Sequence, residues 1–286
     1  MEALAFIPAE ILVVILGLAA AASWGAADFG GGVATKRASE YMVVIITQAV
    51  GAVLLSALAL SFSETMPAFD NAFWGAFAGI SGSLGLIALY RGLSRGRMGV
   101  VAPLSAVVAV ILPVLHSAFY EGLPAIHQMF GFLIAIVGIW FIAGTTEKAE
   151  THFDDLILAL LAGFGFGLFF ISIGQFSGDS LFWPLVIAKL SAVILLLSFV
   201  LVKRSIKLPS RDVLPVIIVA GIFDTGGNLF FAVATQMGRL DIATVTSSLY
   251  PGGTVLLAWL ILKEHLSSKQ WLGVGLALIA LMFISV

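Results

Sequence analysis

The sequence contains little charge and no cysteine. Only 10% of its 286 residues are charged, and the formal net charge is -2, whereas soluble domains contain about 25% charged residues. Without cysteine the chain cannot form a disulfide framework, and it lacks the basic excess that binding to nucleic-acid phosphates requires. These deficits argue against a disulfide-rich secreted domain, an ordinary cytosolic enzyme and a nucleic-acid-binding protein.

Apolar residues dominate instead, at 60% of the chain, with a mean hydropathy of +1.12. A helix crosses the bilayer core with about 20 apolar residues. Ten such segments are predicted, at residues 11–34, 41–62, 73–93, 99–119, 128–144, 156–176, 182–202, 214–236, 241–262 and 270–286. Their runs are continuously apolar, which favours helices over barrel strands. We expect an all-α polytopic, multi-pass integral membrane protein of a prokaryotic inner or plasma membrane.

Basic residues indicate the orientation. All but two of the 14 Lys and Arg residues fall in the loops that join each odd-numbered span to the next; Arg239 lies on the opposite side and Lys189 inside a span. Because short cytoplasmic loops are enriched in Lys and Arg, this asymmetry predicts that both termini are non-cytoplasmic.

The chain resembles itself when it is shifted by 142 positions. The offset places Ala78-Gly79-Ile80 on Ala220-Gly221-Ile222, Gly96-Arg97 on Gly238-Arg239, and Trp24-Gly25 on Phe166-Gly167. The predicted units, residues 1–146 and 147–286, each contain five spans, so they would enter the membrane in opposite senses. Such inverted repeats are typical of secondary transporters, whose sites lie at the repeat interface.

Several motifs resemble the drug/metabolite transporter superfamily, in its ten-helix EamA-type branch. They are Ser23-Trp24-Gly25 with Asp28-Phe29, Ala88-Leu89-Tyr90-Arg91-Gly92, Gly99-Val100-Val101-Ala102-Pro103, Ser248-Leu249-Tyr250-Pro251, Lys263-Glu264-His265-Leu266-Ser267 and Gln270-Trp271-Leu272-Gly273. The resemblance implies a transporter with a cavity lined by spans 1–4 and 6–9. Members commonly place both termini in the cytoplasm, whereas the charge count here predicts the reverse.

Ionisable residues inside spans are functional candidates, because charge within a bilayer is costly. Asp224 shares a helix face with Asn228, and this pair could bind a cation, a proton or an amine; the alternative is a packed, hydrogen-bonded carboxylate. Lys189 could pair with Asp224, hold a substrate carboxylate, or extend to the interface. Asp28 follows Trp24 by one turn, which would present a carboxylate and an aromatic ring together; the alternative is a cap near a helix end.

The remaining candidates are aromatic residues and prolines. Tyr90 and Tyr250 complete the expected cavity, and Pro103, Pro113 and Pro251 are expected to break or bend spans 4 and 9, either as gates or as static kinks. Proline removes a backbone donor from a helix. No nucleotide loop, zinc spacing or catalytic motif occurs in the sequence, so no cofactor, metal or catalytic residue is predicted.

We expect a secondary membrane transporter, not an enzyme, that moves a small organic metabolite or amphipathic compound by alternating access. The expected partners are that small-molecule substrate and the lipid bilayer, with protons as the candidate coupling ion and no nucleic acid. The alternatives are a lipid or lipid-linked-sugar flippase on the same scaffold, a polytopic membrane enzyme and a passive channel. The sequence indicates neither the substrate nor an oligomeric state.

The predicted orientation is testable by thiol labelling, for which the cysteine-free chain is a clean background. A single cysteine introduced by Ala3→Cys should react with a membrane-impermeant maleimide from the non-cytoplasmic face. A cysteine introduced by Ser39→Cys, in the first basic loop, should react from the cytoplasmic face only. Cytoplasmic labelling of the Ala3→Cys variant would overturn the charge argument.

Overall fold

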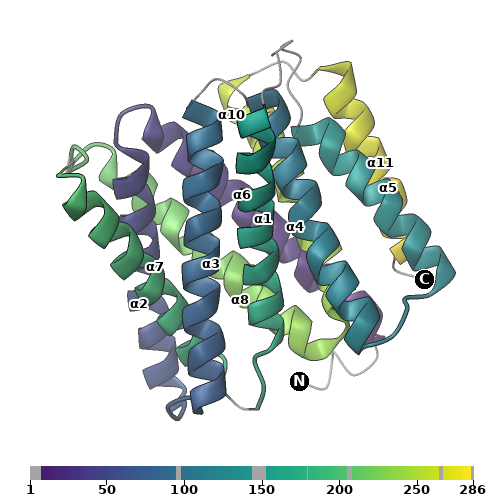
Figure 1. Ribbon diagram of the computed structural model, residues 1–286, viewed down its shortest axis with the longest axis horizontal. Helices are drawn as coiled ribbons and strands as arrows, with labels where there is room; N and C mark the ends of the chain where they lie inside the picture. Colours follow the sequence, from purple (N-terminus) through teal and green to yellow (C-terminus); the bar gives the residue numbers. More distant parts are fainter. Residues whose placement is uncertain are drawn as a thin grey trace.

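The computed structural model describes residues 8–94, 98–143, 153–178, 180–204, 208–263 and 267–284. All regular secondary structure in these ranges is helical (Figure 1). The helices are α1 (Ala9–Thr35), α2 (Glu40–Ser61), α3 (Phe69–Ser94), α4 (Met98–Tyr120), α5 (Ile126–Ala143), α6 (Phe153–Gly174), α7 (Phe182–Val202), α8 (Leu214–Met237), α9 (Leu240–Ser247), α10 (Tyr250–Leu262) and α11 (Ser268–Ile284).

Among the described residues, seven helical stretches are long and apolar enough to cross a membrane, when α9 and α10 are counted as one. The other six are α1, α2, α7, α8 and the apolar parts of α3 and α6, Phe69–Leu89 and Leu156–Gly174. Three shorter apolar helices, Leu104–Tyr120, Ile126–Ile142 and Ser268–Ile284, lie at the remaining predicted spans. The structure therefore confirms a polytopic all-α membrane protein.

The ninth predicted span is broken and the fourth is not. α9 ends at Ser247 and α10 begins at Tyr250, so the chain leaves the helix just before Pro251, as the sequence predicts. α4 continues as one helix through Pro103 and Pro113, so span 4 is not broken there, and a bend of span 4 at these prolines stays a prediction.

The neighbours of each proline explain the difference. Pro251 is followed by Gly252 and Gly253 and preceded by hydroxyl residues, and both types weaken a helix. Pro113 lies among Ile, Leu and Val residues that keep the surrounding ladder intact, so only its own backbone donor is lost at this point of α4.

Helices of the two halves of the chain interleave. α1 packs against α8, α9 and α10, while α6 packs against α3 and α4. α2 with α7 and α5 with α11 form pairs at opposite sides of the bundle (Figure 1). Every one of these contacts joins a helix of the first half to a helix of the second, so the interface between the halves is the core of the molecule.

Glycines allow the backbones at this interface to approach closely. A Cβ at Gly79 of α3 would overlap the Ala188 carbonyl of α7, and a Cβ at Gly221 of α8 would lie 3.0 Å from the Thr47 carbonyl oxygen of α2. Small residues permit such helix contacts in membranes. Gly79 and Gly221 are also 142 positions apart, which is the offset of the sequence self-similarity.

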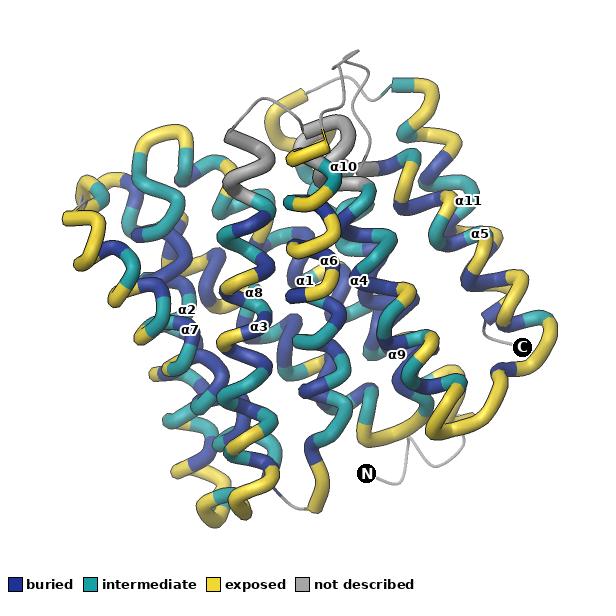
Figure 2. Tube along the Cα trace, in the orientation of Figure 1, coloured by how far each residue is buried: buried dark blue, intermediate teal, exposed yellow. Residues whose placement is uncertain are grey.

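Buried residues lie where helices face one another, and exposed residues follow the outer faces and helix ends (Figure 2). Many exposed residues are large and apolar, including Val53, Leu133, Ile194, Leu201, Val219 and Leu278. Soluble proteins rarely expose so much apolar surface, whereas lipid solvates it. The outer surface of the bundle therefore suits a bilayer.

Adding one methyl group at Gly79 should loosen the α3–α7 contact. We expect Gly79→Ala to lower the free energy of unfolding by about 1–3 kcal/mol, the usual cost of overpacking. Gly32→Ala is the matched control, because a Cβ there meets nothing within 4 Å, and alanine gains up to about 1 kcal/mol over glycine in a helix. Thermal unfolding in detergent measures both, and equal midpoints would contradict the packing argument.

Candidate functional site

Three helices bring an ion pair together inside the bundle. Lys189 Nζ of α7 lies 2.5 Å from Asp224 Oδ2 of α8, and Gln48 Nε2 of α2 donates a hydrogen bond of 3.1 Å to the same oxygen. The Lys189 side chain is 4% exposed and the Asp224 side chain 23%. Pairing with Asp224 is one of the three arrangements that the sequence allows for Lys189, and the structure shows this one.

The position of Asp224 explains why it needs a partner. It lies near the middle of α8, which runs from Leu214 to Met237, and a charge at that depth in a bilayer costs several kcal/mol unless it is compensated. Lys189 supplies the opposite charge and Gln48 a further donor to the same carboxylate oxygen. The cluster therefore joins one residue of the first half to two of the second.

Gly51 of α2 makes room for the lysine. A Cβ at this position would lie 3.1 Å from Lys189 Cε and 2.6 Å from Thr225 Oγ1. The stem of Lys189 thus passes against a helix surface that has no side chain. Sequence reasoning missed both Gly51 and Gln48, because neither is unusual within an apolar span and their role depends on which helices meet.

Asp28 of α1 lies across from Asp224. A Cβ at Gly227 would overlap the Trp24 ring, and one at Gly30 would lie 3.2 Å from Ala220 Cβ, so α1 and α8 run antiparallel with Asp28 near Asp224. The Asp28 carboxyl interacts electrostatically with Asp224, and the Tyr250 hydroxyl interacts with Asp28. The Asp28 side chain is nevertheless exposed in this bundle.

Trp24 belongs to an aromatic cluster. Its ring lies 5.7 Å from that of Phe170, 5.8 Å from Phe231 and 6.5 Å from Tyr250, between centroids, and the Tyr250 contact is edge-on. Trp24 is 9% exposed and Asn228 4% exposed. Trp24 and Asn228 are thus packed into the interface between the halves, near Asp28 and Asp224.

The polar cluster has no counterpart at the related position. Shifting by 142 positions places Asp28 on Phe170, Lys189 on Thr47 and Asp224 on Gly82. A Cβ at Gly82 would lie 3.2 Å from the Phe169 ring, which fills this region. The protein therefore has one off-centre polar site opposite an aromatic one.

The other predicted residues lie elsewhere. Tyr90 is in α3 and Pro103 in α4, but their side chains are outside the described part of the chain. Pro113 is buried within α4, and Pro251 is the second residue of α10. Of the predicted cavity residues, Lys189 contacts Asp224 and Trp24 contacts Tyr250, while Asp28 interacts electrostatically with Asp224 and Tyr250.

Sequence reasoning missed a second charged cluster, at the end opposite the basic loops. Arg239 donates two hydrogen bonds to Asp241, from Nε at 3.1 Å and from Nη2 at 2.7 Å. It also donates to the carbonyl oxygens of Glu121 at 3.3 Å and Gly122 at 2.7 Å. Asp241 is completely buried. We call this the Arg239 clamp, which ties the α8–α9 turn to the α4–α5 loop; the Arg-x-Asp spacing at a span start was its signal.

Two further polar contacts tie the halves together at the same end. Glu64 accepts hydrogen bonds from the backbone N–H groups of Leu181, Phe182 and Trp183 at the start of α7. Asn71 exchanges hydrogen bonds with the backbone of Ser177, at 2.7 Å and 3.1 Å. Residues 62–68 and the described residues between α6 and α7, 175–178 and 180–181, lie at the lower end of the bundle (Figure 1). This end is closed by groups from both halves.

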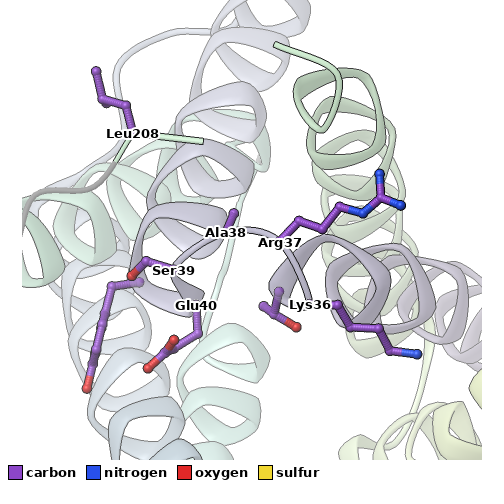
Figure 3. Close-up of a pocket in the computed structure, with 8 residues that line it drawn as sticks. Lys36, Arg37, Ala38, Ser39, Glu40 and Leu208 are labelled. Atoms are coloured by element: carbon purple, nitrogen blue, oxygen red, sulfur yellow. The ribbon is translucent and has the colours of Figure 1, made fainter. Parts of the chain in front are cut away.

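The opposite end of the bundle, which contains the basic loops and is called the basic end below, has a different kind of contact. Its described ion pair, between Arg37 and Asp212, spans 3.6 Å, and both side chains are more than half exposed. A surface hollow of about 680 Å³ lies beside this pair, lined by Thr35, Lys36, Arg37, Ala38, Ser39, Glu40, Tyr41 and Leu208. Lys36 and Arg37 point away from Ser39 and Glu40 there (Figure 3). The hollow contains none of the predicted site residues.

Replacing one partner of the Lys189–Asp224 pair should lower the free energy of unfolding more than replacing both partners. We expect Lys189→Met and Asp224→Asn each to lower the free energy of unfolding by about 3 kcal/mol, because each leaves an unpaired buried charge. The double variant should recover most of this loss. Chemical unfolding in detergent measures the non-additivity.

The matched control is the exposed pair, with Arg37→Met and Asp212→Asn. Exposed pairs contribute about 0–1 kcal/mol, so these losses should be small and additive. Additive losses at Lys189 and Asp224 would contradict a coupled buried pair.

Comparison with known proteins agrees with this architecture. The model of the EamA-like transporter family matches residues 11–144 and again 155–286. An uncharacterized transporter of Archaeoglobus fulgidus is 25% identical over 202 residues, covering 70% of this chain and 71% of that protein. An uncharacterized protein of Methanocaldococcus jannaschii is 29% identical over 133 residues, covering 46% of this chain but 96% of its own length.

A solved protein structure shows the same fold. Its TM-score is 0.79 over 96% of this chain and 98% of that chain, at 16% sequence identity. Because the family model covers both halves of the sequence, the relation extends through nearly all of it. The chain belongs to the EamA-like transporter family.

Proposed function

We propose that this protein is a secondary carrier that moves a small organic compound by alternating access, with the substrate near the Lys189–Asp224 pair. That pair is the observation on which the proposal rests. A buried ion pair contributes little net stability compared with well-packed apolar residues, and ionisable residues within a membrane mark transport pathways. Here the pair lies where α2 of the first half meets α7 and α8 of the second.

The proposed scaffold is ten spans arranged as two inverted five-helix repeats. Three observations support it: the family model matches the chain twice, one relative is only about half as long as this chain, and corresponding helices have corresponding neighbours. α1 packs against α8 and the α9–α10 pair, as α6 packs against α3 and α4. The Gly79 and Gly221 contacts are likewise related by the 142-residue offset.

Alternating access requires that the two ends open in turn. The end with the Arg239 clamp is held by polar contacts between the halves, which include the Glu64 and Asn71 contacts. In the described part of the basic end, the ion pair between the halves is the exposed one of Arg37 and Asp212. We propose that this structure represents a state closed at the clamped end, and that the clamp opens in the opposite state.

A cysteine reporter tests this proposal. Ser23→Cys places one thiol on α1 next to α8, since a Cβ at Gly226 would lie 3.6 Å from Ser23 Oγ. In oriented vesicles, an impermeant maleimide should label it faster from the basic side than from the clamped side. Arg239→Gln should raise the clamped-side rate several-fold by loosening the clamp.

Arg37→Gln is the control, because it removes an exposed pair at the other end and should leave the clamped-side rate unchanged. Fast labelling from both sides of the unmodified reporter would indicate a channel. A clamped-side rate that does not respond to Arg239→Gln would remove the clamp from the transport cycle. Compounds that raise the thermal stability of the protein then become the substrates for counterflow assays.

A further inference from the structure

The charges at the proposed transport site do not balance. Lys189 and Asp224 compensate each other at 2.5 Å, whereas Asp28 has no hydrogen bond or ion pair with any residue that the structure describes. With Asp28 ionised the cluster has one excess negative charge. In a site partly shielded from water, such a charge attracts a cation far more strongly than it would in bulk solvent.

We propose that Asp28 binds the positively charged amine group of the substrate, so that the carrier transports amphipathic organic cations. This inference rests on the proposed function, since it assigns a substrate class to the same site. The chemistry it requires is a carboxylate that is open to a ligand, free of competing protein donors and flanked by apolar or aromatic surface.

Asp224 does not meet this description. Its Oδ2 atom already accepts Lys189 Nζ and Gln48 Nε2, and three helices enclose it. Asp28 differs in both respects, because its side chain is exposed and its interactions with the described residues are long-range ones with Asp224 and Tyr250. The sequence analysis named Asp224 as a candidate for binding a cation. The contacts in the structure favour Asp28 for this role instead.

Lys189 does not provide a site for an anionic substrate. Its side chain is 4% exposed, and its Nζ contacts Asp224. Its stem lies against Gly51, with Lys189 Cε 3.1 Å from the position of a Cβ there. A substrate carboxylate would have to displace Asp224 from the lysine and would leave two aspartates uncompensated. The net negative charge of the site therefore favours a cationic substrate.

The surroundings of Asp28 suit the apolar body of an amine. Tyr250 of α10 interacts with Asp28, and its ring meets that of Trp24 edge-on at 6.5 Å. Trp24 precedes Asp28 by one helical turn, so both lie on the same face of α1. Aromatic rings beside a carboxylate attract ammonium groups by cation–π interaction and bury the attached hydrocarbon.

Binding of matched charged and neutral probes tests this inference on the purified full-length protein. The probes are phenethylammonium and hexylammonium, with 2-phenylethanol and 1-hexanol as neutral analogues. Isothermal titration and thermal shift should show that each cation binds at least tenfold more tightly than its neutral analogue. Asp28→Asn should remove this preference, and Asp28→Glu should retain it.

Asp212→Asn is the control, because Asp212 is an exposed aspartate at the basic end and its loss should leave the preference intact. Equal binding of charged and neutral probes to the unmodified protein would overturn the inference without any variant. So would an Asp28→Asn protein that keeps the preference for cations.

The two proposals fail separately. Loss of the cation preference together with a normal Ser23→Cys response to Arg239→Gln would leave the carrier standing and remove only its substrate class. A cation preference that depends on Asp28, without any labelling response, would establish the binding site and count against alternating access.

Discussion

The need to compensate charge inside a lipid-solvated bundle governs the centre of this structure. A carboxylate at the depth of Asp224 is stable as an ion only beside an opposite charge or in water. Lys189 provides that charge, Gln48 adds a hydrogen bond, and Gly51 provides the space through which the lysine reaches. Three helices from both halves are thereby fixed relative to one another, and Asp28 is left as the acidic group that still lacks a partner among the described residues.

The same constraint explains why two related halves differ at their shared interface. Related contacts such as those at Gly79 and Gly221 build a symmetric scaffold. A second charged cluster at the related position would double the desolvation cost without a second substrate to bind. The chain instead has Phe170 where the first site has Asp28, and an aromatic cluster fills the space. The related glycine contacts thus pack the helices, whereas the ion pair of Lys189 and Asp224 occurs at one of the two related positions only.

Polar contacts join the halves at the end of the bundle that carries Arg239. The Arg239 clamp buries Asp241 completely, yet it holds the loop before α5 through carbonyl oxygens, which release a guanidinium more readily than a second carboxylate would. The break between α9 and α10 lies in the same span as this clamp. The Arg239 clamp and an interrupted helix therefore occur together in the second half.

Hydropathy, loop charge and the 142-residue offset were enough to determine the membrane class, the helical segments and the candidates Asp28, Lys189 and Asp224, because these signals are local or periodic. Which candidates meet was decided only by the tertiary structure. Lys189 and Asp224 are 35 positions apart and Gln48 and Asp224 are 176 apart, so their contact depends on how α2, α7 and α8 cross. The contacts of Arg239 with the carbonyl oxygens of Glu121 and Gly122 were beyond the sequence for the same reason, because these residues lie 118 and 117 positions away in the chain.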